Sequence, residues 1–121
     1  MKDLIKVAII LTLIDVIYLK LIGGGPFIKM VEKIQKKEVK MNLISAVIAY
    51  VLLIASVYLF IIKKNFSNKE AFLLGAITYG IFDATNMALF SEYDPVIAIQ
   101  DSIWGGILFL LTTVIYRKLK K

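Results

Sequence analysis

Three aspartates stand inside long apolar segments of the chain, and they are the residues most able to do chemistry. Asp15, Asp83 and Asp101 each interrupt a run of aliphatic and aromatic residues. A charged side chain near the centre of a bilayer costs about 2.5–3.5 kcal/mol on insertion scales, so such residues usually face a protein interior and have a function. Carboxylates that meet at low dielectric repel one another unless a proton or a cation neutralises them. The three side chains therefore predict a site for a cation or a proton.

Each aspartate is accompanied by polar or aromatic residues on its own helical face, because residues three or four apart on a helix point the same way. Together they form a candidate binding site: Asp15, Tyr18, Tyr79, Asp83, Asn86, Asp101 and Trp104. The aspartates supply charge, the tyrosine hydroxyls and Asn86 supply coordination, and Trp104 supplies a cation–π surface. The same three aspartates are the candidate ligands of a metal, which would have to be a hard cation that prefers oxygen ligands.

The composition excludes several kinds of site. The 121 residues include no cysteine and no histidine. Disulfides, thiol catalysis, structural zinc, haem ligation through histidine and Ser-His-Asp chemistry are therefore excluded. The net charge of +6 does not predict nucleic-acid binding, because the lysines lie in loops and tails, where membrane proteins keep their basic residues.

The elements that must position the aspartates are transmembrane helices. Hydrophobic residues make up 60% of this single-domain chain, more than a water-soluble domain of this size can bury. A spanning helix needs roughly 20 mostly apolar residues, and four segments qualify. These are residues 4–22, 43–62, 71–90 and 96–116. The sequence thus predicts an all-α integral membrane protein, a four-helix bundle formed by one domain over residues 1–121.

The connection between the first two spans has two parts. Gly23-Gly24-Gly25-Pro26 predicts a helix break. Residues 26–40 then place apolar side chains on one helical face and charged ones on the other, which predicts a short amphipathic helix in the headgroup region. A loop that only caps the bundle is the alternative.

The other two connections are short. Ser67 and Glu70 match the capping-box pattern, so we expect the third span to begin after Ser67. Pro95 suits the first turn of the fourth span. Tyr93, in the acidic loop before it, is predicted to be an interfacial anchor together with Phe90.

Basic residues suggest the orientation. With four spans, the two termini and the 63–70 turn share one side, which carries Lys2, Lys6, Lys63, Lys64, Lys69, Arg117, Lys118, Lys120 and Lys121. The opposite side carries Lys20, Lys29, Lys33, Lys36, Lys37 and Lys40. This bias predicts that both termini are cytoplasmic. All three aspartates then lie roughly 8–10 Å below the opposite boundary, at 1.5 Å per residue, and so occupy one layer.

Three segments resemble a known family in their order and spacing. They are Asp15-Val16-Ile17-Tyr18, the stretch from Tyr79 to Asn86 that contains Asp83-Ala84-Thr85-Asn86, and Asp101-Ser102-Ile103-Trp104-Gly105. Over nearly the whole chain they resemble a family of small, mainly bacterial predicted membrane proteins, a domain of unknown function. The resemblance implies four helices and supports the site, but brings no established activity. Two departures are Tyr18, where the family pattern has Trp, and the triple glycine.

Several functions fit these observations. The favoured hypothesis is that the protein binds a cation, a proton or a cationic small molecule. A homo-oligomer surrounded by membrane lipids would then translocate it. A lipid-binding protein or a metal-dependent enzyme acting on lipids is an alternative, although no nucleophile or histidine accompanies the aspartates. A structural or accessory subunit, in which the aspartates only lock helices together, is another.

Overall fold

The computed structural model describes residues 2–120 and is helical throughout, with no strand in that range. Its α-helices are α1 (Lys2–Tyr18), α2 (Gly24–Gln35), α3 (Leu43–Val57), α4 (Asn68–Leu89) and α5 (Pro95–Lys120). Two π-helical turns join or extend them: η1 (Leu19–Gly23) lies between α1 and α2, and η2 (Tyr58–Ile62) continues α3. The expected all-helical fold is confirmed.

Three helices are long and apolar enough to cross a membrane: Leu43–Ile62, Asn68–Leu89 and Pro95–Lys120. The first predicted span corresponds to α1, whose 17 residues are followed by the turn η1. Large apolar side chains on α3 are exposed, among them Leu43 at 70% and Ile44 at 76%. A soluble protein rarely exposes so extensive an apolar face, whereas lipid covers it without cost. The helices are thus those of a multi-pass membrane protein.

The starts of α4 and α5 follow the predicted local chemistry. The Ser67 hydroxyl accepts a hydrogen bond from the Glu70 N–H at 3.1 Å, and the Glu70 carboxylate accepts one from the Ser67 N–H at 2.9 Å. This capping box satisfies two N–H groups that a helix start leaves free. Pro95 is the first residue of α5. Both predicted helix starts are confirmed.

The predicted break at the glycines is wrong, since residues 2–35 form one continuous helical run. In η1 the Gly24 N–H bonds to the Leu19 carbonyl, five residues back instead of four. That turn shifts the hydrogen-bonding register of the helix. Pro26 then falls in the first turn of α2, where a missing N–H costs nothing. The glycine backbone is right-handed helical at Gly24, with φ −66° and ψ −44°. Helical neighbours on both sides thus override the low helix propensity of glycine.

The helix predicted over 26–40 is shorter than expected. It ends at Gln35, because Lys36 adopts a left-handed conformation with φ 59°. Its apolar face packs on the α4–α5 connection: Met30 is buried with Tyr93 and Ala98, and the Phe27 ring meets Tyr93 edge-on. Tyr93 is only 5% exposed, so its predicted role as an interfacial anchor is wrong. α2 caps the bundle at this end.

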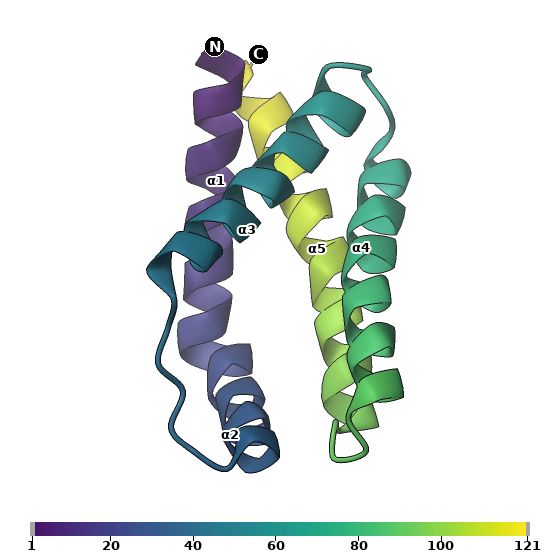
Figure 1. Cartoon of the computed structure of the whole chain (residues 1–121). Helices are drawn as coiled ribbons and strands as arrows, with labels where there is room; N and C mark the ends of the chain where they lie inside the picture. The colour runs from purple at the N-terminus through teal and green to yellow at the C-terminus, as the bar shows by residue number, and fades with distance from the viewer. Residues whose placement is uncertain (1, 121) are drawn as a thin grey trace.

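The helices divide the molecule into two ends (Figure 1). Both termini and the α3–α4 turn lie at one end, and α2 with the α4–α5 loop lies at the other. α4 and α5 pack along their length, and α1 packs on α5 and α3. α3 crosses at an angle and diverges from α4 as it leaves their common turn.

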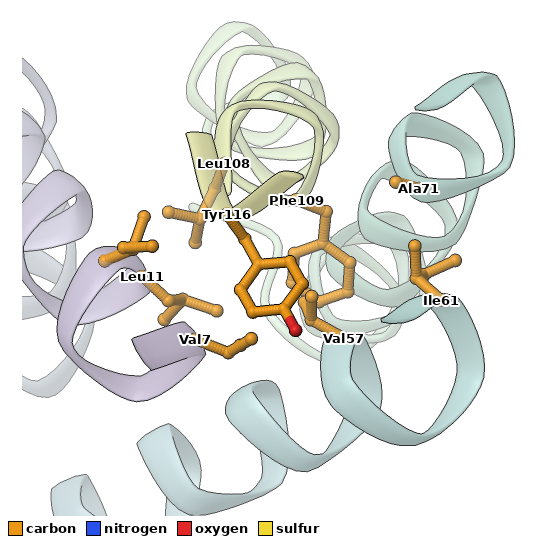
Figure 2. Packing of buried hydrophobic residues seen from close by; sticks show 9 residues of the cluster. Val7, Leu11, Val57, Ile61, Ala71, Leu108, Phe109 and Tyr116 are labelled. Atoms are coloured by element: carbon orange, nitrogen blue, oxygen red, sulfur yellow. The ribbon is translucent and has the colours of Figure 1, made fainter. Parts of the chain in front are cut away.

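The main apolar core fills the end near the termini (Figure 2). Val7 and Leu11 of α1 meet Leu108 and Phe109 of α5, with Val57 closing the cluster from α3. All five side chains are fully buried. This core holds α1, α3 and α5 together, and this packing helps to position the polar residues further along the same helices.

Candidate functional site

Asp15 joins three helices through two hydrogen bonds. The Tyr50 hydroxyl, on α3, donates to its Oδ2 at 2.5 Å. The Trp104 indole N–H, on α5, donates to its Oδ1 at 2.9 Å. The side chain is 6% exposed, and both carboxylate oxygens have a donor. This arrangement satisfies a buried acidic group and ties α1, α3 and α5 to one another.

Asp83 is bound by a residue from the loop that follows its own helix. The Tyr93 hydroxyl donates to its Oδ1 at 2.6 Å, and the Asn86 amide lies beside the same hydroxyl. Burial and the hydrogen bond to Asp83 raise the pKa of Tyr93, so this phenol stays protonated and able to donate. The Ser102 hydroxyl is 3.5 Å from Oδ2 but donates to the Ala98 carbonyl at 3.0 Å. Asp83, at 1% exposed, is the most buried of the three aspartates.

Asp101 differs from both because its neighbour is another acid. Its carboxyl group lies within hydrogen-bonding range of the Asp83 carboxyl. Two carboxylates this close repel each other, and a proton or a cation between them relieves the repulsion. Asp101 is only partly buried. The Asp83–Asp101 pair is therefore the part of the acidic site that calls for a positive charge.

Tyr79 lies at the centre of the site, near the carboxyl groups of all three aspartates. Glycine makes this position possible: a Cβ at Gly105 would overlap the Tyr79 ring, and one at Gly75 would overlap the Gly105 carbonyl. α4 and α5 thus approach closely at these two positions. This approach brings the Tyr79 ring against the backbone of α5.

Tyr18 and Trp104 stack with their ring centroids 3.9 Å apart and their planes 5° from parallel. The Gln100 amide also donates to the Tyr18 hydroxyl at 3.2 Å. The stack orients the Trp104 indole so that its N–H reaches Asp15. One face of Trp104 is therefore covered by Tyr18 and is closed to a cation.

A pocket of about 510 Å³ opens beside the acidic pair. Its walls come from α1, η1, α2, α3, α4 and α5. They are apolar or aromatic apart from Thr78, the tyrosine hydroxyls and one carboxyl group: Tyr18, Leu19, Gly23, Phe27, Ala49, Leu52, Leu53, Thr78, Tyr79, Phe82 and Asp101. Of the three aspartates, Asp101 lines this pocket, and Asp15 and Asp83 do not. The space thus combines an apolar enclosure with a single acidic group.

A comparison with known protein families shows to which family the chain belongs. Residues 1–116 match the family described as "Predicted membrane protein (DUF2177)". The chain belongs to the DUF2177 family. The resemblance carried by the three aspartate motifs is thereby confirmed over nearly the whole length. Searches of curated proteins and of solved structures found no match.

The geometry of this DUF2177 protein separates the predicted site into two parts. Among residues 2–120, no group of three acidic, histidine or cysteine side chains is arranged to hold a metal ion. The physical reason is that both Asp15 oxygens are engaged by Tyr50 and Trp104, which keeps them out of the Asp83–Asp101 pair. Asp15, Asp83 and Asp101 thus do not form such a group in this structure, and a metal centre at these residues stays a prediction.

Sequence reasoning missed three residues of the site. Tyr50 and Tyr93 donate to the aspartates from other segments, and Ser102 lies between Asp83 and the α5 backbone. A tyrosine within the otherwise aliphatic α3 was the available signal for Tyr50, because its hydroxyl needs a partner when buried. Tyr93 could not be distinguished from an interfacial tyrosine without knowing that α2 covers it.

Proposed function

We propose that this DUF2177 protein binds an organic cation with an apolar body in the pocket beside Asp101, and that binding releases a proton from the Asp83–Asp101 pair. The observation that carries this proposal is the position of Asp101. It lies on the wall of an apolar pocket, and the Asp83 carboxyl lies within hydrogen-bonding range of it.

The charge balance of the site supports a monovalent cation. Asp15 has two donors and Asp83 has Tyr93, whereas Asp101 has no donor comparable to these in the described chain. One proton shared between Asp83 and Asp101 leaves the pair with a single negative charge. A cation that pairs with Asp101 removes the need for that proton. The exchange is therefore one cation in and one proton out.

The walls favour an organic cation over a metal ion. A metal ion needs several oxygen ligands, but the pocket offers one carboxyl group among aliphatic and aromatic side chains. Phe27, Tyr79 and Phe82 present rings to the same space. Aromatic faces attract a cation most strongly where water is excluded. An ammonium or phosphonium group with apolar substituents matches both features.

The test uses two ions of the same size and shape with opposite charge. Tetraphenylphosphonium and tetraphenylborate are titrated into the protein in a non-ionic detergent by isothermal calorimetry. Tetraphenylphosphonium should bind and release about one proton per site in weak buffer, and it should bind less tightly as the pH falls. Tetraphenylborate should not bind. Equal binding of both ions would show that the pocket acts only as an apolar surface, and it would reject the proposal.

The variants isolate the acid. Asp101→Asn keeps the size of the side chain and should weaken tetraphenylphosphonium binding by about tenfold or more, equivalent to about 1.4 kcal/mol. Asp94→Asn is the matched control, because Asp94 is an exposed loop carboxylate that only accepts the Val96 N–H. It should bind as the parent does. Unchanged affinity and proton release in Asp101→Asn would contradict the proposed role.

Movement of the cation across the membrane is a further part of the proposal, and it would involve a homo-oligomer. The pocket of one chain lies in the half of the molecule away from the termini, between α3 and α4. A second copy would supply the remainder of a path. Proteoliposomes with an imposed pH gradient test this directly: tetraphenylphosphonium accumulation should depend on the gradient in the parent and vanish in Asp101→Asn.

A further inference from the structure

A second hollow, of about 560 Å³, lies at the opposite end of the molecule, where α5 ends and α4 begins. Its lining combines three cations, two amides and an apolar wall: Ile62, Asn65, Asn68, Val114, Tyr116, Arg117, Lys118 and Lys120. No acidic residue is among them. A concave surface with this charge attracts anions.

Arg117 shapes this hollow. Its guanidinium donates through Nη1 to the Asn68 side chain at 2.8 Å, and through Nη2 to the Phe66 carbonyl. These two bonds fix the guanidinium across the turn that precedes α4. An arginine has five N–H donors, so others remain for a ligand. The rigid guanidinium therefore offers a fixed donor group, which suits the flat oxygen pairs of a phosphate.

Two further features add to the attraction. Asn68 is the first residue of α4, where the helix dipole places partial positive charge. Lys120 holds its ammonium 6.0 Å from the centroid of the buried Tyr116 ring, at the rim of the hollow. Both features favour a negatively charged ligand at the same place.

We propose that this basic hollow binds the phosphate-bearing headgroup of an anionic phospholipid. The lipid source is favoured over a free anion because Ile62 and Val114 form an apolar wall beside the cations, at the ends of membrane-spanning helices. Basic pockets between such helices hold anionic headgroups at the leaflet surface. The apolar wall would meet the glycerol and the first part of an acyl chain. This site is separate from the cation pocket and does not depend on it.

The experiment measures binding of soluble short-chain lipids to the purified full chain by calorimetry in non-ionic detergent. Dihexanoyl phosphatidylglycerol carries a net negative charge. Dihexanoyl phosphatidylcholine carries the same phosphate group but has no net charge. Inorganic phosphate serves as the free anion. We expect the phosphatidylglycerol to bind, and to bind more weakly as the salt concentration rises. The phosphatidylcholine and the inorganic phosphate should bind at least about tenfold more weakly.

The variants keep Arg117 in place, since its bonds to the α4 turn support the fold. Lys118→Gln combined with Lys120→Gln removes two charges from the hollow and should weaken phosphatidylglycerol binding by about tenfold or more. Lys63→Gln combined with Lys64→Gln removes the same charge from the same end, at residues that do not line the hollow. This control should change the affinity by less than about twofold.

Each outcome decides the proposal. Selective loss of affinity in the Lys118 and Lys120 variant supports it. Equal losses in both variants would mean general attraction to a basic surface and would overturn it. Inorganic phosphate that binds as tightly as the phosphatidylglycerol would make this a site for a free anion and would overturn the lipid assignment. Binding in the cation pocket is read separately with tetraphenylphosphonium, so failure of one site leaves the other intact.

Discussion

Two acidic regions of the same protein use the same residue type in opposite ways. At Asp15, donors from two other helices reach both carboxylate oxygens, and the side chain is closed off by Tyr50 and Trp104. At Asp101, the carboxyl of Asp83 lies alongside, and the side chain borders an apolar pocket. The Asp15 carboxylate accepts hydrogen bonds that connect helices. The Asp101 carboxyl is left able to pair with a cation.

This difference teaches that an acidic residue in an apolar helix is not by itself a binding group. Its surroundings decide, because a buried charge with well-placed donors stabilises the fold and one without them must find a counter-ion or a proton. The comparison can be tested by changing each region and measuring stability and ligand binding separately. Substitution of Asp15 should lower the free energy of unfolding, and substitution of Asp101 should weaken cation binding.

The largest effect on stability is expected from Asp15→Ala. It leaves the Tyr50 hydroxyl and the Trp104 N–H without an acceptor, and each orphaned buried donor costs about 1–3 kcal/mol. We expect the free energy of unfolding to fall by about 3 kcal/mol, measured by reversible denaturation in mixed micelles. Tyr50→Phe removes only one of the two bonds and should cost about 1 kcal/mol. Equal stability of Asp15→Ala and the parent would remove the distinction between the two regions.

Much of this fold could be predicted from the sequence because its signals are local. The apolar runs placed the helices, Ser67 with Glu70 located the start of α4, and Pro95 located the start of α5. The three aspartates and Tyr79 were assigned to one site for the same reason, since polar residues in an apolar helix turn inward. These are consequences of the residue and its immediate neighbours.

The parts that failed depend on contacts between distant segments. Whether the triple glycine breaks the helix depends on the π-turn η1, and α2 shields Tyr93 only because its apolar face docks on the α4–α5 loop. The division of the acidic site depends on α3 crossing α1, which brings Tyr50 to Asp15 across 35 residues of sequence. No periodicity or motif reports such a crossing angle.

A smaller effect is expected from Tyr93→Phe, which removes the donor to Asp83 and should cost about 1 kcal/mol at neutral pH. The pH dependence carries the sharper result. Because burial and Asp83 raise the folded-state pKa of Tyr93 above the usual value of about 10, the unfolded chain loses this proton first. Stability from Tyr93 is therefore complete below pH 10 and declines as the pH rises above it.

The measurement compares the unfolding free energies of the parent and Tyr93→Phe between pH 8 and 11. Their difference should be constant up to about pH 10 and shrink above it, because only the parent loses the Tyr93 contribution. Tyr58→Phe, at a partly buried tyrosine near the other end of the molecule, is the control. It undergoes the same general alkaline denaturation but keeps Tyr93. A gap that stays constant or widens above pH 10 would show that the Tyr93 phenol is not held in its protonated form by Asp83.

Gly23→Ala should change the Asp15 region with little effect on stability. A Cβ at Gly23 would overlap the Tyr18 ring, so the ring must shift, which disturbs its stack on Trp104. The lost stacking, about 1 kcal/mol, is offset by the better helix propensity of alanine. Trp104 is the single tryptophan of the chain, and its fluorescence reports the change directly. Gly25→Ala, where a Cβ meets no atom within 4 Å, should leave the emission unaltered.

The smallest stability effect is expected from Asp101→Asn, and its smallness separates the two regions most clearly. The substitution removes the proton that the pair shares, and the new amide donates to the Asp83 carboxylate in its place. The unfolding free energy should therefore stay within about 0.5 kcal/mol of the parent, or rise. Tetraphenylphosphonium binding should weaken by about tenfold or more in the same variant. A fall in stability as large as that of Asp15→Ala, with ligand binding intact, would mean that Asp101 serves the fold and that both acidic regions are structural.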